Sequence, residues 1–334
     1  MELYLDSADI REIDQAFQLG YLTGLTTTPT FMHRHGITDI DGTILELAKK
    51  VPVLQIEALG DTAEAIVAEA QRLDALGLDR DKTVYKIPVS LEGTRACRIL
   101  VDQGYQVNLH LVYTLQQAYM AMAAGATYIC PLVGRLQDQG TDALALVADC
   151  VAAVDHYGYA SKIMFSSVRT AQHVRDALEV GAHAITVPWK IMKALTDNHF
   201  TALGTAQFVQ HTNLLTRTVR EAMRSAHPTA PSHAHVLDAL VPMTASGLGA
   251  CTIVDEQGAP LGIFTDGDLR RLIERGADPK TTGLEAYLNP SMITVDAHAL
   301  LIDAEALFTT HQVDTLVVVE GGKAVGLIDI QDLH

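Results

Sequence analysis

The sequence predicts an α/β protein in which a (β/α)8 TIM barrel is followed by a smaller region built from two similar halves. Short apolar strand candidates alternate with amphipathic stretches from residue 1 to about 200, and the C-terminal part nearly repeats itself. A proline-bearing segment at residues 227–233 marks the change of pattern. We therefore expect a barrel over 1–224, a linker over 225–235 and the repeated region over 236–334.

The eight strand candidates are short apolar or β-branched runs, and each precedes a stretch with helical periodicity, such as 62–76. In chain order they are residues 2–6, 21–26, 53–57, 83–88, 106–112, 127–133, 162–167 and 184–188. Gly-Ala pairs before the sixth and eighth runs fit the turns between a helix and a strand. A further amphipathic stretch, 206–224, is expected to close the barrel or to pack on a neighbouring subunit.

The composition argues against several classes of function. Of the 334 residues, 48% are hydrophobic, which is enough to form two hydrophobic cores. The formal net charge of −16 argues against nucleic acid or anionic membranes as partners. The four cysteines show no C-x-x-C spacing, so we expect neither a zinc knuckle nor a disulfide framework. The acidic start M-E-L-Y-L-D and the lack of a long uncharged apolar run predict a cytoplasmic protein.

Lys86 is the first catalytic candidate because it stands alone in the strand T-V-Y-K-I-P-V-S. A lysine in an apolar strand is costly unless its amine is neutral, and a neutral amine can form a Schiff base with a carbonyl. From this motif alone, an edge-strand lysine whose amine reaches water is equally consistent. The barrel prediction favours catalysis, because Lys86 falls near the C-terminal end of the fourth strand, where barrel enzymes carry their active sites.

Five motifs resemble the transaldolase family, especially its short branch that includes fructose 6-phosphate aldolase. They are M-E-L-Y-L-D, G-L-T-T-T-P-T, Y-K-I-P-V-S, C-P-L-V-G-R and F-S-S-V-R-T, in the family's order and spacing. The resemblance implies a homo-oligomeric class I enzyme that needs no cofactor or metal and acts on phosphorylated sugars and aldehydes. It makes Lys86 the Schiff-base lysine and Asp6 the acid/base that takes a hydroxyl proton as the C–C bond breaks. Asp6 could instead serve only as the N-cap of the following helix, but Ser7 is the better cap candidate, which favours the catalytic role for Asp6.

The resemblance also assigns a water site and a phosphate clamp. Asn108 matches an asparagine that hydrogen-bonds the donor near the imine, and Gln55 matches the Glu/Gln position that holds the catalytic water. A polar group satisfied inside the barrel is the alternative for Gln55. Arg135, Ser167 and Arg169 match the family's phosphate clamp. Two guanidiniums and a hydroxyl suit a phosphate dianion.

Four departures from the family's pattern fall on the donor side. Thr28 replaces the asparagine of T-T-N-P, His110 a threonine, Cys130 a serine or alanine, and Leu132 an aromatic residue. Thr26, in the same motif as Thr28, is expected to bind substrate with them. We therefore expect a retained phosphoaldehyde partner and an altered donor. His110 is either a proton donor or a core histidine satisfied by a carboxylate.

The C-terminal halves share one pattern of a strand, a Gly turn, a second strand and a helix. The two halves have similar sequences in this region. The first half contains C-T-I-V-D-E-Q-G-A-P-L-G-I-F-T-D-G-D-L, and the second contains L-V-V-V-E-G-G-K-A-V-G-L-I-D-I-Q-D-L. This pattern resembles a tandem pair of CBS domains, and most of all the pair in bacterial arabinose 5-phosphate isomerases, which supply the Kdo sugar of lipopolysaccharide. The resemblance implies one cleft for a nucleotide or sugar nucleotide, held by Thr265 and Asp268, because Asp329 replaces the hydroxyl in the second half. A pair that only mediates dimerisation is the alternative.

Together these features predict a Schiff-base enzyme that makes or breaks a C–C bond in phosphorylated sugars under control of the CBS pair. A transaldolase would transfer a dihydroxyacetone unit from a ketose phosphate such as fructose 6-phosphate. An aldolase could instead join glycolaldehyde to glyceraldehyde 3-phosphate and give arabinose 5-phosphate for Kdo supply. The alternative from another class is a sensor that binds sugar phosphate and nucleotide without turnover, and the presence of both Asp6 and Lys86 argues against it.

Overall fold

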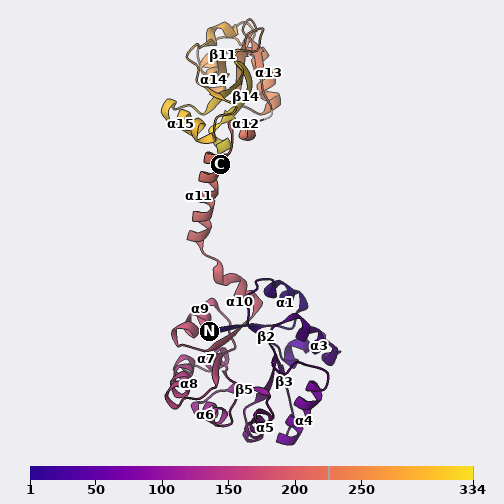
Figure 1. Ribbon diagram of the computed structural model, residues 1–334. Coiled ribbons are helices and arrows are strands. Elements are labelled where there is room, and N and C mark those ends of the chain that lie inside the picture. The colour runs from indigo at the N-terminus through magenta and orange to yellow at the C-terminus, as the bar shows by residue number, and fades with distance from the viewer. Residues whose placement is uncertain (225, 334) are drawn as a thin grey trace. The chain divides into compact units, whose positions relative to one another are not determined.

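A computed structural model gives the structure of the chain and describes residues 1–224 and 226–333. The chain forms two compact units, Met1–Asp197 and Asn198–His334 (Figure 1). The first unit is an α/β barrel, and the second contains the repeated region. Each unit has its own hydrophobic core.

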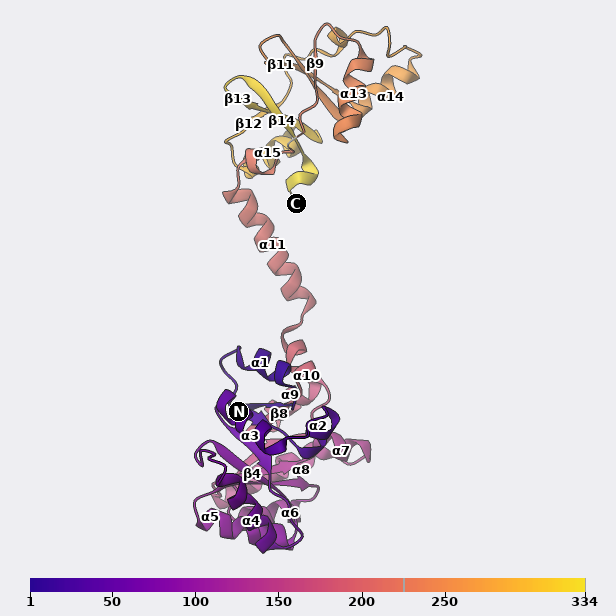
Figure 2. The ribbon, with the colours of Figure 1, turned by 90° about the vertical axis from the view of Figure 1, so that its right-hand side faces the viewer.

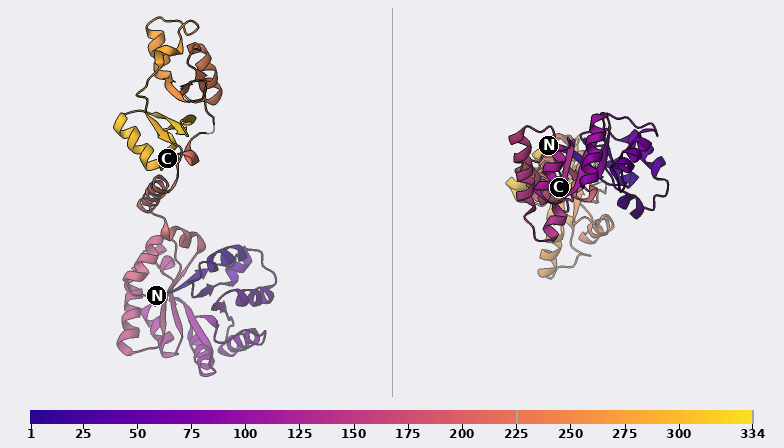
Figure 3. Two further views of the ribbon diagram at one scale, coloured as in Figure 1. Left: turned by 45° about the horizontal axis from the view of Figure 1, so that its top comes forward. Right: turned by 90° about the horizontal axis from the view of Figure 1, so that it is seen from below.

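Within the described residues of the first unit, eight parallel strands close into a barrel in sequence order, and helices cover its outside (Figures 1 and 3). The strands are β1 (Glu2–Asp6), β2 (Gly24–Thr26), β3 (Leu54–Glu57), β4 (Thr83–Pro88), β5 (Gln106–Val112), β6 (Tyr128–Pro131), β7 (Lys162–Phe165) and β8 (Ala184–Val187). The helices are α1 (Ile10–Phe17), α2 (Pro29–Arg34), α3 (Ile40–Lys50), α4 (Ala63–Asp74), α5 (Leu91–Asp102), α6 (Leu115–Ala123), α7 (Val133–Asp138), α8 (Ala143–Tyr157), α9 (Ala171–Glu179) and α10 (Trp189–Lys193), followed by the 3-10 turn η1 (Ala194–Thr196). The predicted barrel is confirmed.

Hydroxyl caps fix the points at which several barrel helices leave the strand ends. Thr62, Ser90, Thr114 and Thr170 cap α4, α5, α6 and α9, and each accepts a hydrogen bond from a backbone N–H in the first turn. The prediction that Ser7 caps the first helix is wrong. Asp9 caps α1 by accepting from the Arg11 N–H, whereas the Ser7 hydroxyl donates to Glu12. The Asp6 carboxylate is therefore not used as a helix cap.

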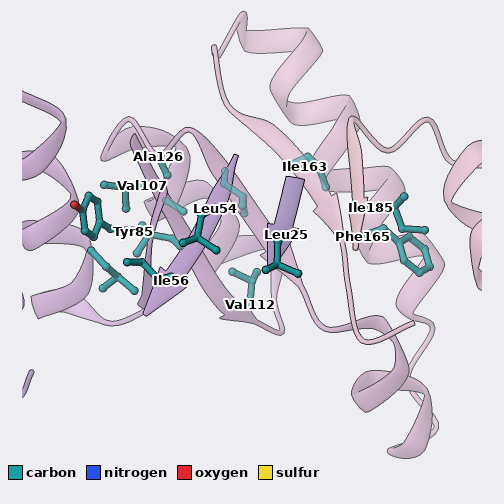
Figure 4. Close-up of a cluster of buried hydrophobic side chains, with 14 of the residues drawn as sticks. Leu25, Leu54, Ile56, Tyr85, Val107, Val112, Ala126, Ile163, Phe165 and Ile185 are labelled. Carbon is teal, nitrogen blue, oxygen red and sulfur yellow. The ribbon is translucent and has the colours of Figure 1, made fainter. Parts of the chain in front are cut away.

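The main core of the barrel lies between the strands and the surrounding helices, where outward-facing residues of the strands pack. Figure 4 shows Leu54, Ile56, Val107 and Phe165 among them, and all are buried. A smaller cluster of inward-facing residues fills the barrel itself: Tyr4, Val84, Tyr128, Cys130, Met164 and Ala184. The hydroxyls of Tyr4 and Tyr128 lie 2.8 Å apart, and Tyr128 donates to Glu2. These residues close the barrel below the C-terminal ends of the strands.

The second unit contains two similar three-stranded sheets, which Figure 2 shows with their helices. The first repeat consists of β9 (Thr229–Pro231), α13 (Val236–Ser246), β10 (Ala250–Val254), β11 (Pro260–Thr265), α14 (Asp266–Glu274) and the turn η2 (Leu284–Tyr287). The second consists of β12 (Thr294–Asp296), α15 (Leu301–His311), β13 (Thr315–Glu320), β14 (Lys323–Asp329) and the turn η3 (Ile330–Leu333). Two helices precede them, α11 (His199–Thr216) and α12 (Val219–Ala222), and both contact α15. In each sheet the first strand runs parallel to the middle strand, and a hairpin joins the other two.

The repeats pack on each other through one shared hydrophobic cluster. Leu248 and Ala250 of the first repeat pack with Val317 and Leu327 of the second. The segment 227–233, predicted as a linker, contains β9, which pairs with β10 and is therefore part of the first sheet. The repeat predicted from the sequence is confirmed, and the two copies form one packed pair.

Candidate active site

A pocket of about 440 Å³ opens where the barrel strands end. Asp6, Thr26 and Glu57 are the last residues of β1, β2 and β3, and all three line it. The predicted residues that line this pocket are Asp6, Thr26, Thr28, Lys86, Asn108, His110, Cys130, Leu132, Arg135 and Ser167. Gln55 and Arg169 are not among the lining residues. Most of the residues that the motifs indicated are far apart in the sequence, and the structure brings their side chains together in one pocket.

Lys86 is buried in the barrel, with 6% of its side chain exposed. Its Nζ donates a hydrogen bond of 3.2 Å to the backbone oxygen of Thr27 and lies 3.0 Å from Glu57 Oε1. A closed barrel has no edge strand, so the alternative of an edge-strand lysine is wrong. Lys86 stands alone in its strand, but in the folded barrel its amine forms an ion pair with Glu57 on the neighbouring strand.

Asp6 lies partly buried in the same pocket, at the end of β1. Its Oδ1 accepts a hydrogen bond of 2.9 Å from Thr26 Oγ1, which also lies 2.5 Å from Thr186 Oγ1. Burial raises the pKa of Asp6, while the positive charge of Lys86 and the bond from Thr26 oppose this rise. A partly buried carboxyl with a raised pKa, in the same pocket as an amine, is a group that can exchange a proton during a reaction.

Glu57 is an acidic residue of this pocket that no sequence motif had indicated. Its side chain is 5% exposed, and its Oε2 lies 2.9 Å from His110 Nε2. That separation is typical of a hydrogen bond, but neither atom makes an aligned one among the described residues, so the contact in this structure is electrostatic. Burial alone raises the pKa of Glu57, but Lys86 and His110 outweigh it and the pKa is lowered. Its position two residues after Gln55 on the same strand face was the available signal.

Asn108 and Gln55 form a buried amide pair on the strands that flank β4. Asn108 Nδ2 donates to Gln55 Oε1 over 2.7 Å. Among the described residues, Asn108 Oδ1 and Gln55 Nε2 have no hydrogen-bond partner. Gln55 is therefore satisfied only in part by local contacts and can act on the pocket through Asn108. An unpartnered buried acceptor on a pocket-lining residue is suited to a hydroxyl of a ligand or a water.

The predicted phosphate clamp is only partly assembled around the pocket. Arg135 and Ser167 line it, whereas Arg169 forms an ion pair with Asp138 on α7. Ser167 and Arg169 are nevertheless close together. A Cβ added to Gly134 would clash with the Ser167 carbonyl and lie 2.9 Å from Arg169 Nε.

Two positive-φ residues shape the pocket wall. Ser167 has φ +59°, which is uncommon for a residue other than glycine and is a feature of strained functional loops. Leu111 has φ +58° at an irregularity of β5, and this irregularity allows both His110 and Leu111 to line the pocket.

The other donor-side departures make the wall less polar. Cys130 is buried, and burial raises the pKa of its thiol to about 11, so the thiol is neutral near pH 7. Leu132 is almost fully buried beside Ser166, with which it forms a bridge. Thr28 caps α2 by accepting from the Phe31 N–H over 3.3 Å. On the same helix, Arg34 also lines the pocket, and no sequence motif had indicated it.

In the first repeat, Thr265 and Asp268 form the capping box of α14. The Thr265 N–H donates to Asp268 Oδ2 over 2.9 Å, and Arg271 Nη2 donates to Asp268 Oδ1 over 2.7 Å. Burial alone raises the pKa of Asp268, but the bonds from Thr265 and Arg271 outweigh it and lower the pKa. At the equivalent place in the second repeat, Asp332 accepts from the Asp329 N–H and pairs with Arg224 at 3.0 Å.

The described residues contain neither a metal-binding cluster nor a helix suited to span a membrane. Among residues 1–224 and 226–333, no group of three or more His, Cys, Asp or Glu side chains is arranged to hold a metal ion. No helix within the same residues has the length and apolar character needed to cross a membrane.

The fold and pocket define an α/β-barrel enzyme. The family model described as transaldolase/fructose-6-phosphate aldolase matches residues 3–230, and the CBS domain model matches 219–275 and 284–334. The chain therefore belongs to the transaldolase/fructose 6-phosphate aldolase family and carries a pair of CBS domains.

Two relatives in sequence agree with the family assignment. A protein named probable transaldolase from Streptococcus equi subsp. zooepidemicus (strain MGCS10565) is 36% identical over 211 residues, which are 63% of this chain and 97% of that protein. One of the same name from Streptococcus pyogenes serotype M5 (strain Manfredo) is 37% identical over 211 residues, with the same shares of 63% and 97%. A solved CBS domain protein from Pyrobaculum aerophilum, complexed with AMP, is 19% identical over 34% of this chain and 88% of that chain, with a TM-score of 0.32.

Proposed function

We propose that this enzyme uses Lys86 to form a Schiff base with a carbonyl donor and makes or breaks a C–C bond in phosphorylated sugars. The observation that carries the proposal is the burial of the Lys86 amine in the same pocket as the Asp6 carboxyl. The amine attacks the carbonyl carbon, water leaves, and the resulting iminium withdraws electrons from the bond to be broken. Asp6 takes the proton of the hydroxyl on the departing carbon.

The acceptor or aldehyde product carries its phosphate near Arg135. A guanidinium that lines the pocket beyond the strand ends, with Ser167 beside it, can bind a phosphate by charge-assisted hydrogen bonds. Arg169 would join this site by exchanging its surface ion pair with Asp138 for the phosphate. Because an exposed ion pair contributes little to stability, breaking it costs little free energy.

The donor that we propose differs from the usual dihydroxyacetone unit of the family. Thr28, His110, Cys130 and Leu132 all line the pocket, which supports the assignment of these departures from the family's pattern to the donor. Glycolaldehyde is our leading candidate, and its addition to glyceraldehyde 3-phosphate would give arabinose 5-phosphate. The resemblance of the CBS pair to that of arabinose 5-phosphate isomerases supports this assignment. Transfer of a dihydroxyacetone unit from fructose 6-phosphate is the second candidate.

We further propose that the CBS pair binds one nucleotide or sugar nucleotide in the first repeat and regulates the barrel. Asp268 uses its oxygens for Thr265 and Arg271, but a carboxylate has further lone pairs that can accept ribose hydroxyls. In the second repeat, Asp329 brings a negative charge to the place of the hydroxyl, which opposes binding of a phosphate. A cytidine nucleotide linked to Kdo is the first ligand to test.

Borohydride trapping tests the central proposal. The full chain is incubated with fructose 6-phosphate, dihydroxyacetone or glycolaldehyde, reduced with borohydride and measured by intact mass. We expect a stable adduct whose mass identifies the donor and whose peptide map places it on Lys86. Failure of the folded protein to form an adduct or to turn over any of these compounds would instead support a sensor that binds without catalysis.

A further inference from the structure

Glu57 is placed against Lys86 by the register of the barrel. It ends β3, and its Cα partner on β4 is Lys86. Its two carboxylate oxygens have different neighbours, since Oε1 lies 3.0 Å from Lys86 Nζ and Oε2 lies 2.9 Å from His110 Nε2. The carboxylate therefore lies between the amine and the imidazole, and all three groups line the same pocket.

The pocket thus holds two carboxyl groups in different settings. Asp6 has a hydroxyl partner and a pKa raised by burial, whereas Glu57 contacts two basic groups that lower its pKa against burial. When environments separate the pKa values of two neighbouring acids, the two acids are suited to different roles. Asp6 is suited to carry a proton during C–C cleavage, and Glu57 is suited to be an anion both in the free enzyme and beside a positively charged imine.

We propose that Glu57 is the counter-ion of the protonated imine on Lys86 and exchanges protons with His110 while that imine forms. This proposal rests on the Schiff-base function proposed above. Before the amine can attack, its ammonium form must lose one proton, and Glu57 Oε1 is the nearest carboxylate atom. That proton passes through the carboxylate to His110 Nε2, which lies 2.9 Å from Oε2, once the imidazole turns into line with that oxygen.

The same proton completes the dehydration. After attack on the carbonyl carbon, one N–H proton moves to the new oxygen, and the proton held by Glu57 and His110 adds to it as the C–O bond breaks. Ammonium and carbonyl thereby give one iminium and one water, with no proton left over. The iminium keeps one N–H, which donates to Glu57, and the negative carboxylate stabilises its positive charge.

A carboxylate at this place also disfavours one class of donor. In a 2-oxo acid, the acid group is attached directly to the carbon that binds Lys86, so it would lie near Glu57 in a buried pocket. Like charges at such a separation repel strongly when water is excluded. Removal of the Glu57 charge should therefore allow a 2-oxo acid such as pyruvate to form an imine, which a purely structural role for Glu57 would not produce.

The test compares Glu57→Gln with wild type in single-turnover borohydride trapping, using the donor that wild type accepts best. We expect Glu57→Gln to form the Lys86 adduct about 100-fold more slowly, the scale of general acid–base catalysis. It should also gain an adduct with pyruvate. Glu57→Asp keeps the charge and should recover part of the rate. Glu12→Gln is the matched control, because the Glu12 carboxylate accepts a hydrogen bond from Ser7 outside the pocket. Glu12→Gln should form the adduct at the wild-type rate.

A double variant tests the exchange with His110. If the proton passes through both groups, Glu57→Gln with His110→Asn should be no slower than the slower single variant. Additive losses would overturn the shared path. Trapping in folded Glu57→Gln at the wild-type rate, with no pyruvate adduct, would overturn the counter-ion itself. Absence of any adduct in wild type would refute the Schiff-base proposal instead, so the two failures are distinguishable.

Discussion

Asn108 Nδ2 donates a hydrogen bond of 2.7 Å to Gln55 Oε1, and this bond connects the two strands on either side of the strand that carries Lys86. The bond orients both amides inside the barrel. It leaves Asn108 Oδ1 without a partner among the described residues, although a buried amide oxygen normally has one. We therefore propose that a hydroxyl of the donor or a water fills this position, with a direct role for Asn108 and a supporting one for Gln55.

Lys86→Met should abolish both turnover and the borohydride adduct, because no amine remains to attack the carbonyl. The substitution also leaves the Glu57 charge buried without its partner, which costs about 3–5 kcal/mol. Lys86→Met combined with Glu57→Gln should therefore be more stable than Lys86→Met alone and still inactive. Intact mass and thermal unfolding measure both effects. An adduct that persists in Lys86→Met would refute the assignment of the nucleophile.

Arg135→Ala should raise KM for phosphorylated substrates by about 10- to 150-fold, because a lost charge-assisted hydrogen bond is worth about 1.5–3 kcal/mol. The matching unphosphorylated sugars should be affected little. Arg169→Ala should show the same selectivity if Arg169 leaves Asp138 to bind phosphate. Arg175→Ala is the control, since Arg175 forms an exposed pair with Glu179 on α9. Equal losses with both kinds of substrate would make these arginines structural.

Asp268→Ala should abolish nucleotide binding by the full chain, measured by calorimetry with adenine, guanine and cytidine ligands. The substitution also removes one side of the α14 capping box, which costs about 1 kcal/mol of stability. Asp303→Ala is the matched control, because Asp303 accepts from the Leu300 N–H in the same way at the start of α15. Binding that survives Asp268→Ala, or binding of no nucleotide by wild type, would favour a pair that only mediates dimerisation.

The strand pattern was predicted best where apolar and β-branched residues run without interruption. β4 and β5 have the predicted bounds, Thr83–Pro88 and Gln106–Val112. β2 is shorter than predicted, because Tyr21 is 63% exposed and pairing begins only at Gly24. A Cβ at Gly24 would clash with the Val53 backbone, so the strands approach closely there. Hydrophobicity alone does not reveal such a start.

Pocket residues that belong to a recognisable sequence motif were predicted well. Residues that reach the pocket only through the pairing register of the strands were predicted poorly. Lys86 and Asp6 stand in distinctive motifs. Glu57 looks like the end of an ordinary strand, and its contact with Lys86 follows only from the pairing of β3 with β4. Arg34 lies on a helix after β2, where no spacing rule indicates that it will line the pocket.

The altered donor side should appear as altered donor preference. We expect weak transaldolase turnover with fructose 6-phosphate and better turnover with glycolaldehyde, measured as kcat/KM for each. Leu132 offers no hydrogen bond, and the Thr28 hydroxyl already accepts from the Phe31 N–H. Each donor hydroxyl that loses a partner carries a cost of about 1–3 kcal/mol. Efficient turnover of fructose 6-phosphate by wild type would show that these substitutions are neutral.

His110 should control the acid side of the pH profile. Burial lowers its pKa from the usual 6.5; Glu57 opposes this shift, while the charges of Lys86 and Arg135 add to it. The imidazole is therefore neutral at pH 7 in the free enzyme and gains its proton only below pH 6.5. The acid limb of kcat/KM, which reports the free enzyme, should accordingly include an ionisation below pH 6.5.

His110→Asn should remove that ionisation and lower kcat by about 100-fold, the scale of a lost proton-transfer group. The same shift predicts a stability effect with a definite sign. The unfolded chain protonates His110 near pH 6.5 and the folded chain only at lower pH, so this residue lowers the free energy of unfolding as the pH falls below 6.5. His110→Asn should lose that part of the pH dependence in thermal unfolding. A variant with wild-type kcat and an unchanged profile would show that His110 is only a buried histidine beside Glu57.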